Sequence, residues 1–346
     1  MLTDSFARVH DYLRIAITDR CNFRCTYCMP EDGISLGPNA KLLSFSEIET
    51  LARLFVQHGV RKIRITGGEP LVRPEVEQLF EMLGAIKGVE ELGISTNGAL
   101  LTAHLPSLLA NRVHHLNISL DTLRPDRFRS ITGRDEFEAV NKAIRSAVEY
   151  RVDGSSFASV KVNMVVMRGT NDDEVLDFVR FGEELAALAH GGPAMEIRFI
   201  EFMPFPGNEW NAEQSIPWRE LLSNIEQEFS LRPVRSPNAK SSTAKSFEVQ
   251  SLRTQEPLNF RIGFITTVSE HFCAECSRLR LTADGEFRAC LFGQDGVNLR
   301  DMLRRGETPD AMATAITRVL KDKWPEHPPV HELAFLNNRE MISIGG

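Results

Sequence analysis

The chain has 346 residues, a length that suits one large α/β unit with an appendage, or two domains. Of these residues 42% are hydrophobic and 25% are charged, which is typical of a soluble globular protein. Its formal net charge of −7 argues against broad nucleic-acid binding but leaves room for a local basic pocket. No apolar run approaches the ~18 residues that span a bilayer, and residues Met1 to Tyr12 lack the apolar core of a secretory signal. We therefore expect a cytoplasmic protein that binds neither nucleic acid nor a membrane.

Short β-rich runs alternate with helical patterns from Tyr12 to about Met203. Such alternation predicts a parallel sheet built from strand–helix units. Six units are too few for a closed eight-stranded barrel, so we predict an incomplete (β/α)6 parallel barrel over residues 1–203. The six predicted strands are Tyr12–Ile17, Lys62–Thr66, Glu91–Ser95, His115–Leu120, Val160–Met167 and Glu196–Phe202.

Three amphipathic stretches between these runs predict helices. We expect Ser46 and Glu49 to form a capping box on the first, and Asn171–Asp172 to cap the third. The apolar positions are Ile48, Leu51, Leu54 and Phe55 in the first stretch, Phe137, Val140, Ile144 and Val148 in the second, and Val175, Leu176, Val179 and Leu185 in the third.

Most of the predicted strands alternate polar with apolar residues, although strands of a buried parallel sheet usually read as nearly continuous apolar runs. If the apolar side packs on the helices, the polar side lines a lumen, and its cations suit a polyanionic ligand. A sheet with one solvated face is the alternative. The polar positions are Arg14, Lys62, Arg64, Thr66, Asn117, Ser119, Lys161, Asn163 and Arg198.

The strand–helix repeat stops beyond Met203, and residues 204–346 predict a smaller C-terminal α+β region. Ser236–Ser246 is rich in Ser, Lys and Ala and predicts a flexible loop to which we assign no role. The candidate elements are strands at Asn259–Ile265 and Arg278–Thr282 and a helix at about Asp310–Lys321.

The six cysteines fall into two groups of three. Cys21, Cys25 and Cys28 directly follow the first strand in a C-x3-C-x2-C pattern. Three thiolates on one loop can hold three corners of a [4Fe-4S] cluster and leave the fourth iron open. A zinc site would need a fourth ligand, which no nearby histidine supplies, and a disulfide would leave one cysteine over. We therefore favour an iron–sulfur cluster.

Cys273, Cys276 and Cys290 form the second group, in a C-x2-C-x13-C pattern. His271 could complete a structural zinc site, which is the alternative here. Arg278 and Arg280 lie on one face of the following strand, and arginine pairs bind phosphates. This favours a second cluster that faces a phosphate-bearing ligand.

The first group resembles the motif of the radical S-adenosylmethionine (SAM) enzymes, in the form Cys21-Asn-Phe-Arg-Cys25-Thr-Tyr27-Cys28. In that superfamily the open iron binds the amino and carboxylate groups of SAM. The resemblance implies SAM contacts at Tyr27, at Gly68 within Thr66-Gly-Gly68-Glu-Pro70, at Ser119 and at Met203.

The second group, the run from Cys276 to Arg280 and the terminal glycine pair together resemble the GTP 3′,8-cyclase family over essentially the whole chain. The family usually has Asn where this chain has Ser277. The resemblance implies that a second [4Fe-4S] cluster binds the guanine of GTP. It also implies GTP contacts at Arg14, Arg64, Ser95, Thr96, Lys161, Arg278, Leu279 and Arg280, and catalytic roles for Arg14, Arg278, Arg280, Gly345 and Gly346.

The activity so implied is that of a lyase. A 5′-deoxyadenosyl radical from SAM removes H3′ of GTP, and C3′ then bonds to C8 to give 3′,8-cyclo-7,8-dihydro-GTP, the first step of molybdenum cofactor biosynthesis. An external electron donor is required. Transfer of the product to the next enzyme, cyclic pyranopterin monophosphate synthase, and formation of a homodimer stay open. The alternatives are a radical SAM peptide maturase with an auxiliary cluster, a non-catalytic iron–sulfur electron carrier, and a zinc-stabilised interaction protein.

Overall fold

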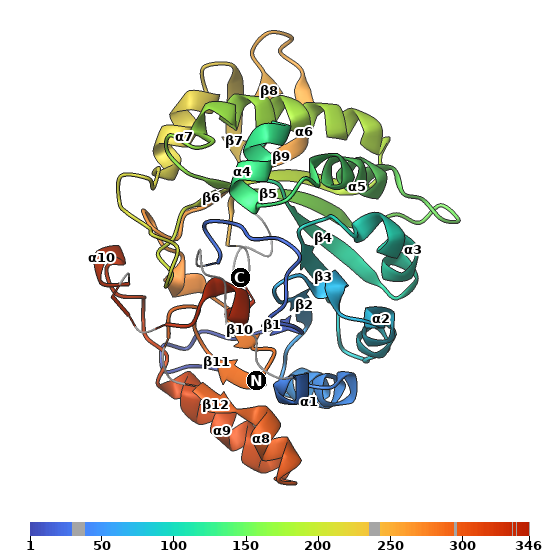
Figure 1. Cartoon of the computed structure of the whole chain (residues 1–346), viewed down its shortest axis with the longest axis vertical. Coiled ribbons are helices and arrows are strands. Elements are labelled where there is room, and N and C mark those ends of the chain that lie inside the picture. Colours follow the sequence, from blue (N-terminus) through green and yellow to red (C-terminus); the bar gives the residue numbers. More distant parts are fainter. Residues whose placement is uncertain (30–38, 235–242, 294–295, 334, 337, 346) are drawn as a thin grey trace.

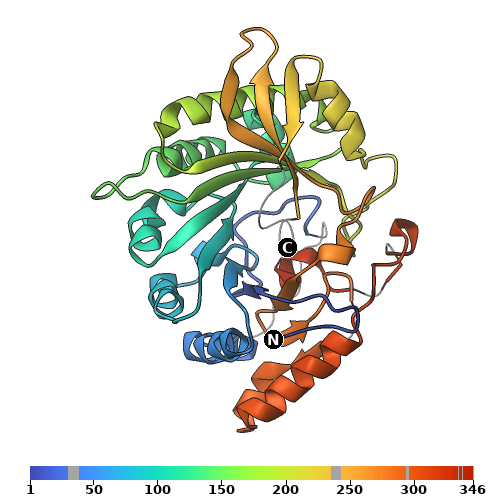
Figure 2. The ribbon, with the colours of Figure 1, turned by 180° about the vertical axis from the view of Figure 1, so that it is seen from behind.

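A computed structural model describes residues 1–29, 39–234, 243–293, 296–333, 335–336 and 338–345. Within these residues a curved sheet of twelve strands runs in the order β12-β11-β10-β1-β2-β3-β4-β5-β6-β9-β8-β7. Figures 1 and 2 show the helices α1, α2, α3, α5 and α6 outside this curve and the C-terminal end of the chain inside it.

The central six strands confirm the predicted incomplete barrel, because they pair in parallel and in chain order. Each lies within two residues of its predicted bounds. The strands are β1 (Tyr12–Ala16), β2 (Lys62–Thr66), β3 (Glu91–Thr96), β4 (Val113–Ser119), β5 (Ser159–Val166) and β6 (Ala194–Glu201).

The helices that follow the strands cover the apolar side of the sheet. Leu13, Ile15, Ile63 and Ile65 are at most 1% exposed beneath them, so alternate strand residues form the core, as the two-residue period of a strand requires. The helices are α1 (Phe45–Gln57), α2 (Val76–Gly84), α3 (Leu101–Ala110), α4 (Pro125–Thr132), α5 (Phe137–Glu149) and α6 (Val175–Ala189).

Both predicted helix caps were wrong. The capping box of α1 uses Ser44 and Glu47, two residues earlier than predicted, because the helix begins at Phe45 and Ser46 already lies within its first turn. A short 3-10 helix, η3 (Asp172–Glu174), precedes α6. Asn171 does not cap it, because its side chain amide instead bonds to the backbone of three residues near the end of β5 and β4.

The C-terminal region extends the same sheet at both edges. β9 (Pro257–Ile265) pairs in parallel with β6, and β10 (Arg278–Leu281) pairs in parallel with β1. Sequence reasoning predicted both strands but neither partner. The remaining elements are β7 (Phe229–Pro233), β8 (Lys245–Ser251), β11 (Glu286–Arg288), β12 (Gly296–Asn298), α7 (Trp218–Ile225), α8 (Leu299–Arg304), α9 (Pro309–Lys321), α10 (Val330–Leu333) and α11 (Met341–Ile344).

The predicted loop Ser236–Ser246 is partly a strand, since Lys245 and Ser246 begin β8. Ser246 donates a hydrogen bond to Glu196, which fixes the start of the strand. Residues 236–242 of the predicted loop lie outside the described residues.

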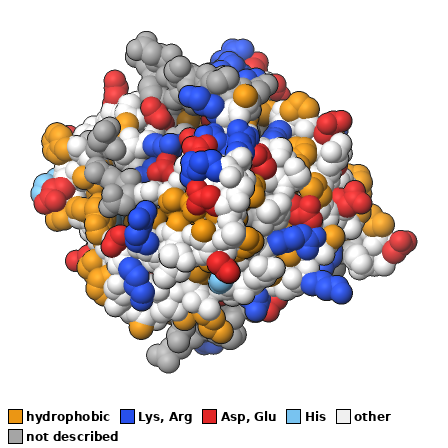
Figure 3. Space-filling model, turned by 90° about the horizontal axis from the view of Figure 1, so that it is seen from below, with side chains coloured by type: hydrophobic (Ala, Val, Ile, Leu, Met, Phe, Trp, Pro, Cys, Tyr) orange, Lys and Arg blue, Asp and Glu red, His pale blue; other side chains and the backbone are white. Residues whose placement is uncertain are grey.

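Acidic and basic side chains are interspersed over the face seen in Figure 3, among the atoms that it colours by type. None of the helices in the described part of the chain has both the length and the apolar surface that crossing a bilayer needs.

Candidate active site

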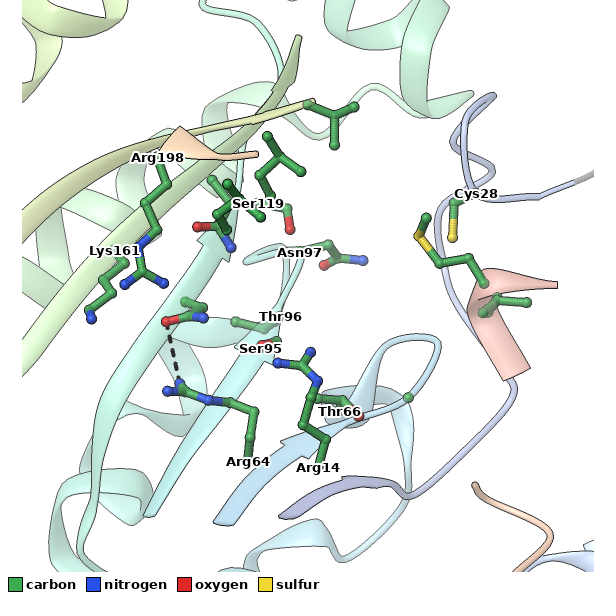
Figure 4. Close-up of a pocket in the computed structure, with 18 of the residues that line it drawn as sticks. Arg14, Cys28, Arg64, Thr66, Ser95, Thr96, Asn97, Ser119, Lys161 and Arg198 are labelled. Carbon is green, nitrogen blue, oxygen red and sulfur yellow. Dashed lines mark hydrogen bonds between the residues drawn. The ribbon is translucent and has the colours of Figure 1, made fainter. Parts of the chain in front are cut away.

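A cavity of about 430 Å³ lies inside the curve of the sheet, within the range of small-molecule sites. All nine polar strand positions named from the sequence line it. The polar side of the sheet therefore faces a cavity and not bulk solvent, which confirms the lumen prediction. Figure 4 shows Lys161 and Arg198 on one side of this cavity and Cys28 on the other.

The first cysteine trio lies on the loop after β1, and all three thiols line the cavity. Burial, followed by the neighbouring thiols and acidic groups, raises the pKa of Cys28 to about 12 and that of Cys25 well above its usual range. Burial also raises the pKa of Cys21 to about 11. Such thiols become thiolates when a metal supplies the compensating charge, so the donor set fits a metal cluster.

The spacing of the donors bears on the zinc alternative. Among the described residues, no three His, Cys, Asp or Glu side chains gather closely enough to hold a single metal ion. Zinc needs its ligands around one centre, whereas a [4Fe-4S] cluster distributes its thiolates over separate irons.

The loop that carries the first trio is fixed to the end of α4. The backbone N–H groups of Arg24 and Thr26 donate to the carbonyls of Thr132 and Ile131, and the guanidinium of Arg134 donates to the Asn22 carbonyl at 2.7 Å. The loop that carries the thiols is therefore held in place by one distant segment of the chain, residues 131–134.

The residues named for SAM line the same cavity as this trio: Tyr27, Gly68, Ser119 and Met203. The hydroxyl of Tyr27 donates to Asp121 at 2.8 Å. Gly68 has no room for a side chain, because a Cβ atom there would lie 2.3 Å from the carbonyl oxygen of Arg20.

Glu69 is almost completely buried and accepts hydrogen bonds from Leu71 N, Asn97 N and the Thr96 hydroxyl. Burial raises its pKa to about 7 although these donors oppose the shift. The hydroxyl of Thr96, named for GTP, thus donates to Glu69, and both Ser95 and Thr96 line the cavity.

Three arginines form one row across neighbouring strands. Arg14 of β1 is in register with Arg280 of β10 and with Arg64 of β2. The guanidinium of Arg64 reaches across β3 to the carbonyl of His115 at 2.9 Å. It passes over Gly93, where a Cβ atom would lie 2.6 Å from Arg64 Nη1.

The electrostatic potential around this row is strongly positive. Burial raises the pKa of Tyr12, but the charges of Arg64 and Arg14 outweigh it and lower the pKa to about 7. Burial lowers the pKa of Lys161 to about 8, with a further contribution from Arg198. A polyanion bound here would relieve the repulsion among these cations.

One carboxylate organises the cations at the far edge of the cavity. Glu196 accepts a hydrogen bond from Arg198 Nε at 2.7 Å, and Lys161 Nζ lies 3.5 Å from the same oxygen. Glu196 was missed as a site residue, because its carboxylate carries the same negative charge as the expected polyanionic ligand and so did not look like a ligand contact. Asp121 and Asn97 were missed as well; both follow strand ends, where ligand-contacting residues gather.

The second trio lies behind the cavity wall, since none of its cysteines lines the cavity although Arg278 and Arg280 do. Burial raises the pKa of Cys276, but the charges of Arg278 and Lys323 outweigh it and lower the pKa to about 7. The hydroxyl of Ser277 is buried without a hydrogen-bond partner in the described part of the structure.

Two placements qualify the sequence predictions. His271, the fourth ligand of the zinc alternative, lies 3.1 Å from Glu326. The side chain of Leu279 is fully buried in the core, on the opposite face of β10 from Arg278 and Arg280, so only its backbone can face a ligand.

The C-terminal tail reaches the arginine row. The carbonyl oxygen of Gly345 accepts hydrogen bonds from Arg280 Nη1 at 2.8 Å and from Arg14 Nε at 3.3 Å. A Cβ atom at Gly345 would lie 2.3 Å from the Thr66 hydroxyl, so only glycine fits. Gly346 lies outside the described residues.

Two family models match the sequence. Residues 15–182 match the Radical SAM superfamily, and residues 195–329 match Molybdenum Cofactor Synthesis C.

Curated relatives match over nearly the whole chain. It is 44% identical to the GTP 3′,8-cyclase, mitochondrial, of Arabidopsis thaliana, over 100% of this chain and 84% of the relative. It is 37% identical to the GTP 3′,8-cyclase of Desulforamulus reducens, over 100% of both. It is 46% identical to Molybdenum cofactor biosynthesis protein 1 of Bos taurus, over 99% of this chain and 51% of that protein. The chain therefore spans about half the length of the bovine relative.

Solved structures share the fold. The crystal structure of Streptococcus suis SuiB bound to precursor peptide SuiA matches with a TM-score of 0.58 and 15% identity, over 98% of this chain and 70% of that one. SuiB bound to S-adenosylmethionine matches with a TM-score of 0.55 and 14% identity, over 98% and 69%. At these identities the likeness concerns the fold alone.

Proposed function

The chain belongs to the radical SAM superfamily and, within it, to the GTP 3′,8-cyclase family, and on this premise we propose that it converts GTP to 3′,8-cyclo-7,8-dihydro-GTP in the first step of molybdenum cofactor biosynthesis. One observation carries the proposal. A cysteine trio and a row of arginines line the same cavity, and Figure 4 shows Cys28 and the cations on different sides of it. A radical precursor and a triphosphate can therefore meet there.

Cys21, Cys25 and Cys28 would hold the first [4Fe-4S] cluster, with SAM on its open iron. When bound, these groups supply the 5′-deoxyadenosyl radical that removes H3′ of GTP before C3′ bonds to C8. The chain contributes position and exclusion of water. Tyr27, anchored by Asp121, would lie beside the adenine, and Gly68, Ser119 and Met203 would bound the rest of SAM.

The arginine row would bind the triphosphate. Arg14 and Arg64 project into the cavity from the neighbouring strands β1 and β2, and Lys161 projects into it from β5. Guanidinium groups bind phosphate oxygens in pairs of parallel hydrogen bonds. Arg64 is already oriented by its backbone acceptors, so little side-chain entropy is lost on binding. Ser95, Thr96 and the backbone of Leu279 complete the proposed GTP contacts.

Cys273, Cys276 and Cys290 would hold a second [4Fe-4S] cluster whose open iron binds guanine. Support comes first from the charges of Arg278 and Arg280, both of which line the cavity. Second, burial lowers the pKa of Arg280, and the charges of Cys290 and Cys276 raise it again. Arg14, Arg278 and Arg280 would then act on the substrate from the wall between the trio and the cavity.

Gly345 and Gly346 would take part in catalysis through the tail. The hydrogen bonds from Arg14 and Arg280 to Gly345 support this role, because they bring a backbone without side chains to the edge of the cavity. The position of Gly346 stays a prediction.

We further propose that residues 1–203 act as the radical SAM unit and residues 204–346 as the unit for the second cluster. The family models divide the chain earlier, since one ends at residue 182 and the other begins at residue 195, and one sheet joins both parts. The boundary at residue 203 stays a prediction. The external electron donor, the next pathway enzyme as a partner, a homodimer and the cytoplasmic location stay predictions. One relative carries the word mitochondrial in its name.

The test is anaerobic incubation of the reconstituted protein with GTP, SAM and dithionite. We expect 5′-deoxyadenosine and a cyclised nucleotide in equal amounts. A protein loaded with about eight irons that forms neither product contradicts the proposal. If the purified protein contains zinc and no iron, the result favours a zinc-stabilised interaction protein. If it contains iron but does not bind GTP, the result favours an electron carrier. If it modifies a peptide and does not convert GTP, the result favours a peptide maturase.

A further inference from the structure

Lys323 is a buried cation outside the cavity. It follows the last residues of α9 and is only 7% exposed. Among the described residues, the sulfur of Cys276, 4.0 Å from Nζ, is the hydrogen-bond partner of its ammonium group. Burying an ammonium group without a negative partner costs free energy of folding. A negatively charged sulfur at Cys276 would offset this cost.

The sulfur that this ammonium faces belongs to the second trio. Cys276 is one of the three proposed ligands of the second cluster, so Lys323 lies directly beside the proposed cluster site.

The N-terminal segment fixes both partners. The guanidinium of Arg8 donates to the carbonyl of Cys273 at 2.7 Å and to the carbonyls of Trp324 and Pro325 at 2.6 and 2.7 Å. Its charge is balanced by Asp4, at 2.5 Å. One side chain therefore joins the loop of the second trio to the two residues that directly follow Lys323.

We propose that Lys323 is a positioning residue that provides a fixed positive charge beside the second cluster and raises its reduction potential, with Arg8 holding it in place. The inference rests on the proposed function, because it needs a cluster on the second trio. Reduction adds one negative charge to a cluster that three thiolates already make negative. A nearby cation in a poorly polarisable interior stabilises that reduced form more than the oxidised one.

The experiment uses the full chain with Cys21, Cys25 and Cys28 changed to alanine, so that only the second trio can hold a cluster. In this background Lys323→Met is compared with Lys321→Met, which removes an exposed lysine at the end of the same helix, and with Lys323→Arg, which keeps the charge. The readouts are iron per chain and a potentiometric titration followed by EPR.

We expect about four irons in each protein. Lys323→Met should lower the midpoint potential of the cluster. At a fixed applied potential the ratio of reduced to oxidised cluster should fall at least tenfold, which corresponds to a shift of 59 mV for a one-electron couple. Lys321→Met should leave the potential unchanged, and Lys323→Arg should stay closer to the parent than Lys323→Met.

An unchanged potential in Lys323→Met overturns the inference and leaves the proposed function standing. If Lys323→Met loses its iron, recovery of iron in Lys323→Arg supports the requirement for charge, and failure to recover it overturns the inference. A parent protein without iron overturns the second cluster and this inference together, whereas cyclisation by the unaltered chain tests the activity separately.

Discussion

Nη1 of Arg280 lies 2.8 Å from the carbonyl oxygen of Gly345, although 65 residues separate the two in the chain. Arg14, in register with Arg280 on the neighbouring strand, donates to the same oxygen. The tail therefore meets two of the proposed substrate-binding arginines at one point.

Gly345→Ala should displace the tail. Gly345 has a φ of 73°, and its added Cβ atom would meet the Thr66 hydroxyl at 2.3 Å. We expect cyclisation to fall roughly 100-fold, the effect that a small misplacement in an active site can have, with iron content unchanged. Gly306→Ala is the control, since its φ of 75° gives the same backbone strain but its Cβ atom would meet nothing within 4 Å. Equal activity in the two variants would contradict the role of the tail.

Arg64→Lys should weaken GTP binding. The substitution keeps the charge but removes the planar fork, whose orientation depends on the carbonyls of Ile94 and His115. We expect KM for GTP to rise about 10-fold or more, in line with the loss of a charge-assisted hydrogen bond, while the KM for SAM stays the same. Arg61→Lys is the control outside the cavity. If the KM for SAM changes and the KM for GTP does not, Arg64 does not bind GTP and the prediction is wrong.

Tyr27 and Asp121 should act as one unit on SAM. Their side chains share a hydrogen bond of 2.8 Å, and both line the cavity. Tyr27→Phe and Asp121→Ala should each weaken SAM binding, and the double variant should lose less than the sum, with an interaction energy of about 0.5–3 kcal/mol. Equilibrium binding of SAM to the reconstituted variants measures this cycle. Strict additivity would show that the bond does not position Tyr27.

His10 should make the metal-free fold sensitive to acid. Burial, with help from the charge of Lys323, lowers the pKa of His10 from 6.5 to about 4. The unfolded chain therefore takes up this proton at a higher pH than the folded chain, and the free energy of unfolding falls as the pH drops from 6.5 towards 4. Between pH 7 and pH 5 this group should cost about 2 kcal/mol.

Urea unfolding at both pH values tests this effect. His10→Gln should lose about 2 kcal/mol less than the parent over that interval, because glutamine does not titrate. His331→Gln, whose side chain is 79% exposed, should behave as the parent does. The same loss in all three proteins would rule out His10 as the source.

The central strands could be predicted because their two faces differ in polarity. Residues such as Arg64 and Lys161 alternate with fully buried Ile63, Val160 and Val162, and this period identifies both the strand and the side that faces the cavity. The first trio could be placed for the same reason, since it directly follows a recognisable strand.

Contacts between distant segments could not be predicted. The pairing of β10 with β1 brings Arg280 beside Arg14. These residues lie far apart in the sequence, so no local sequence pattern indicates that their strands pair. The burial of Lys323 against Cys276 depends in the same way on Arg8, near the other end of the chain. The burial of the Leu279 side chain in the core follows from strand alternation.

The most direct test of the proposed activity uses GTP carrying deuterium at C3′ with SAM and dithionite. If the cavity holds the ribose of GTP against the radical precursor bound near Cys28, one deuterium should appear in 5′-deoxyadenosine for each cyclised nucleotide. 5′-Deoxyadenosine that forms in the presence of this GTP but contains no deuterium from C3′ would contradict the account.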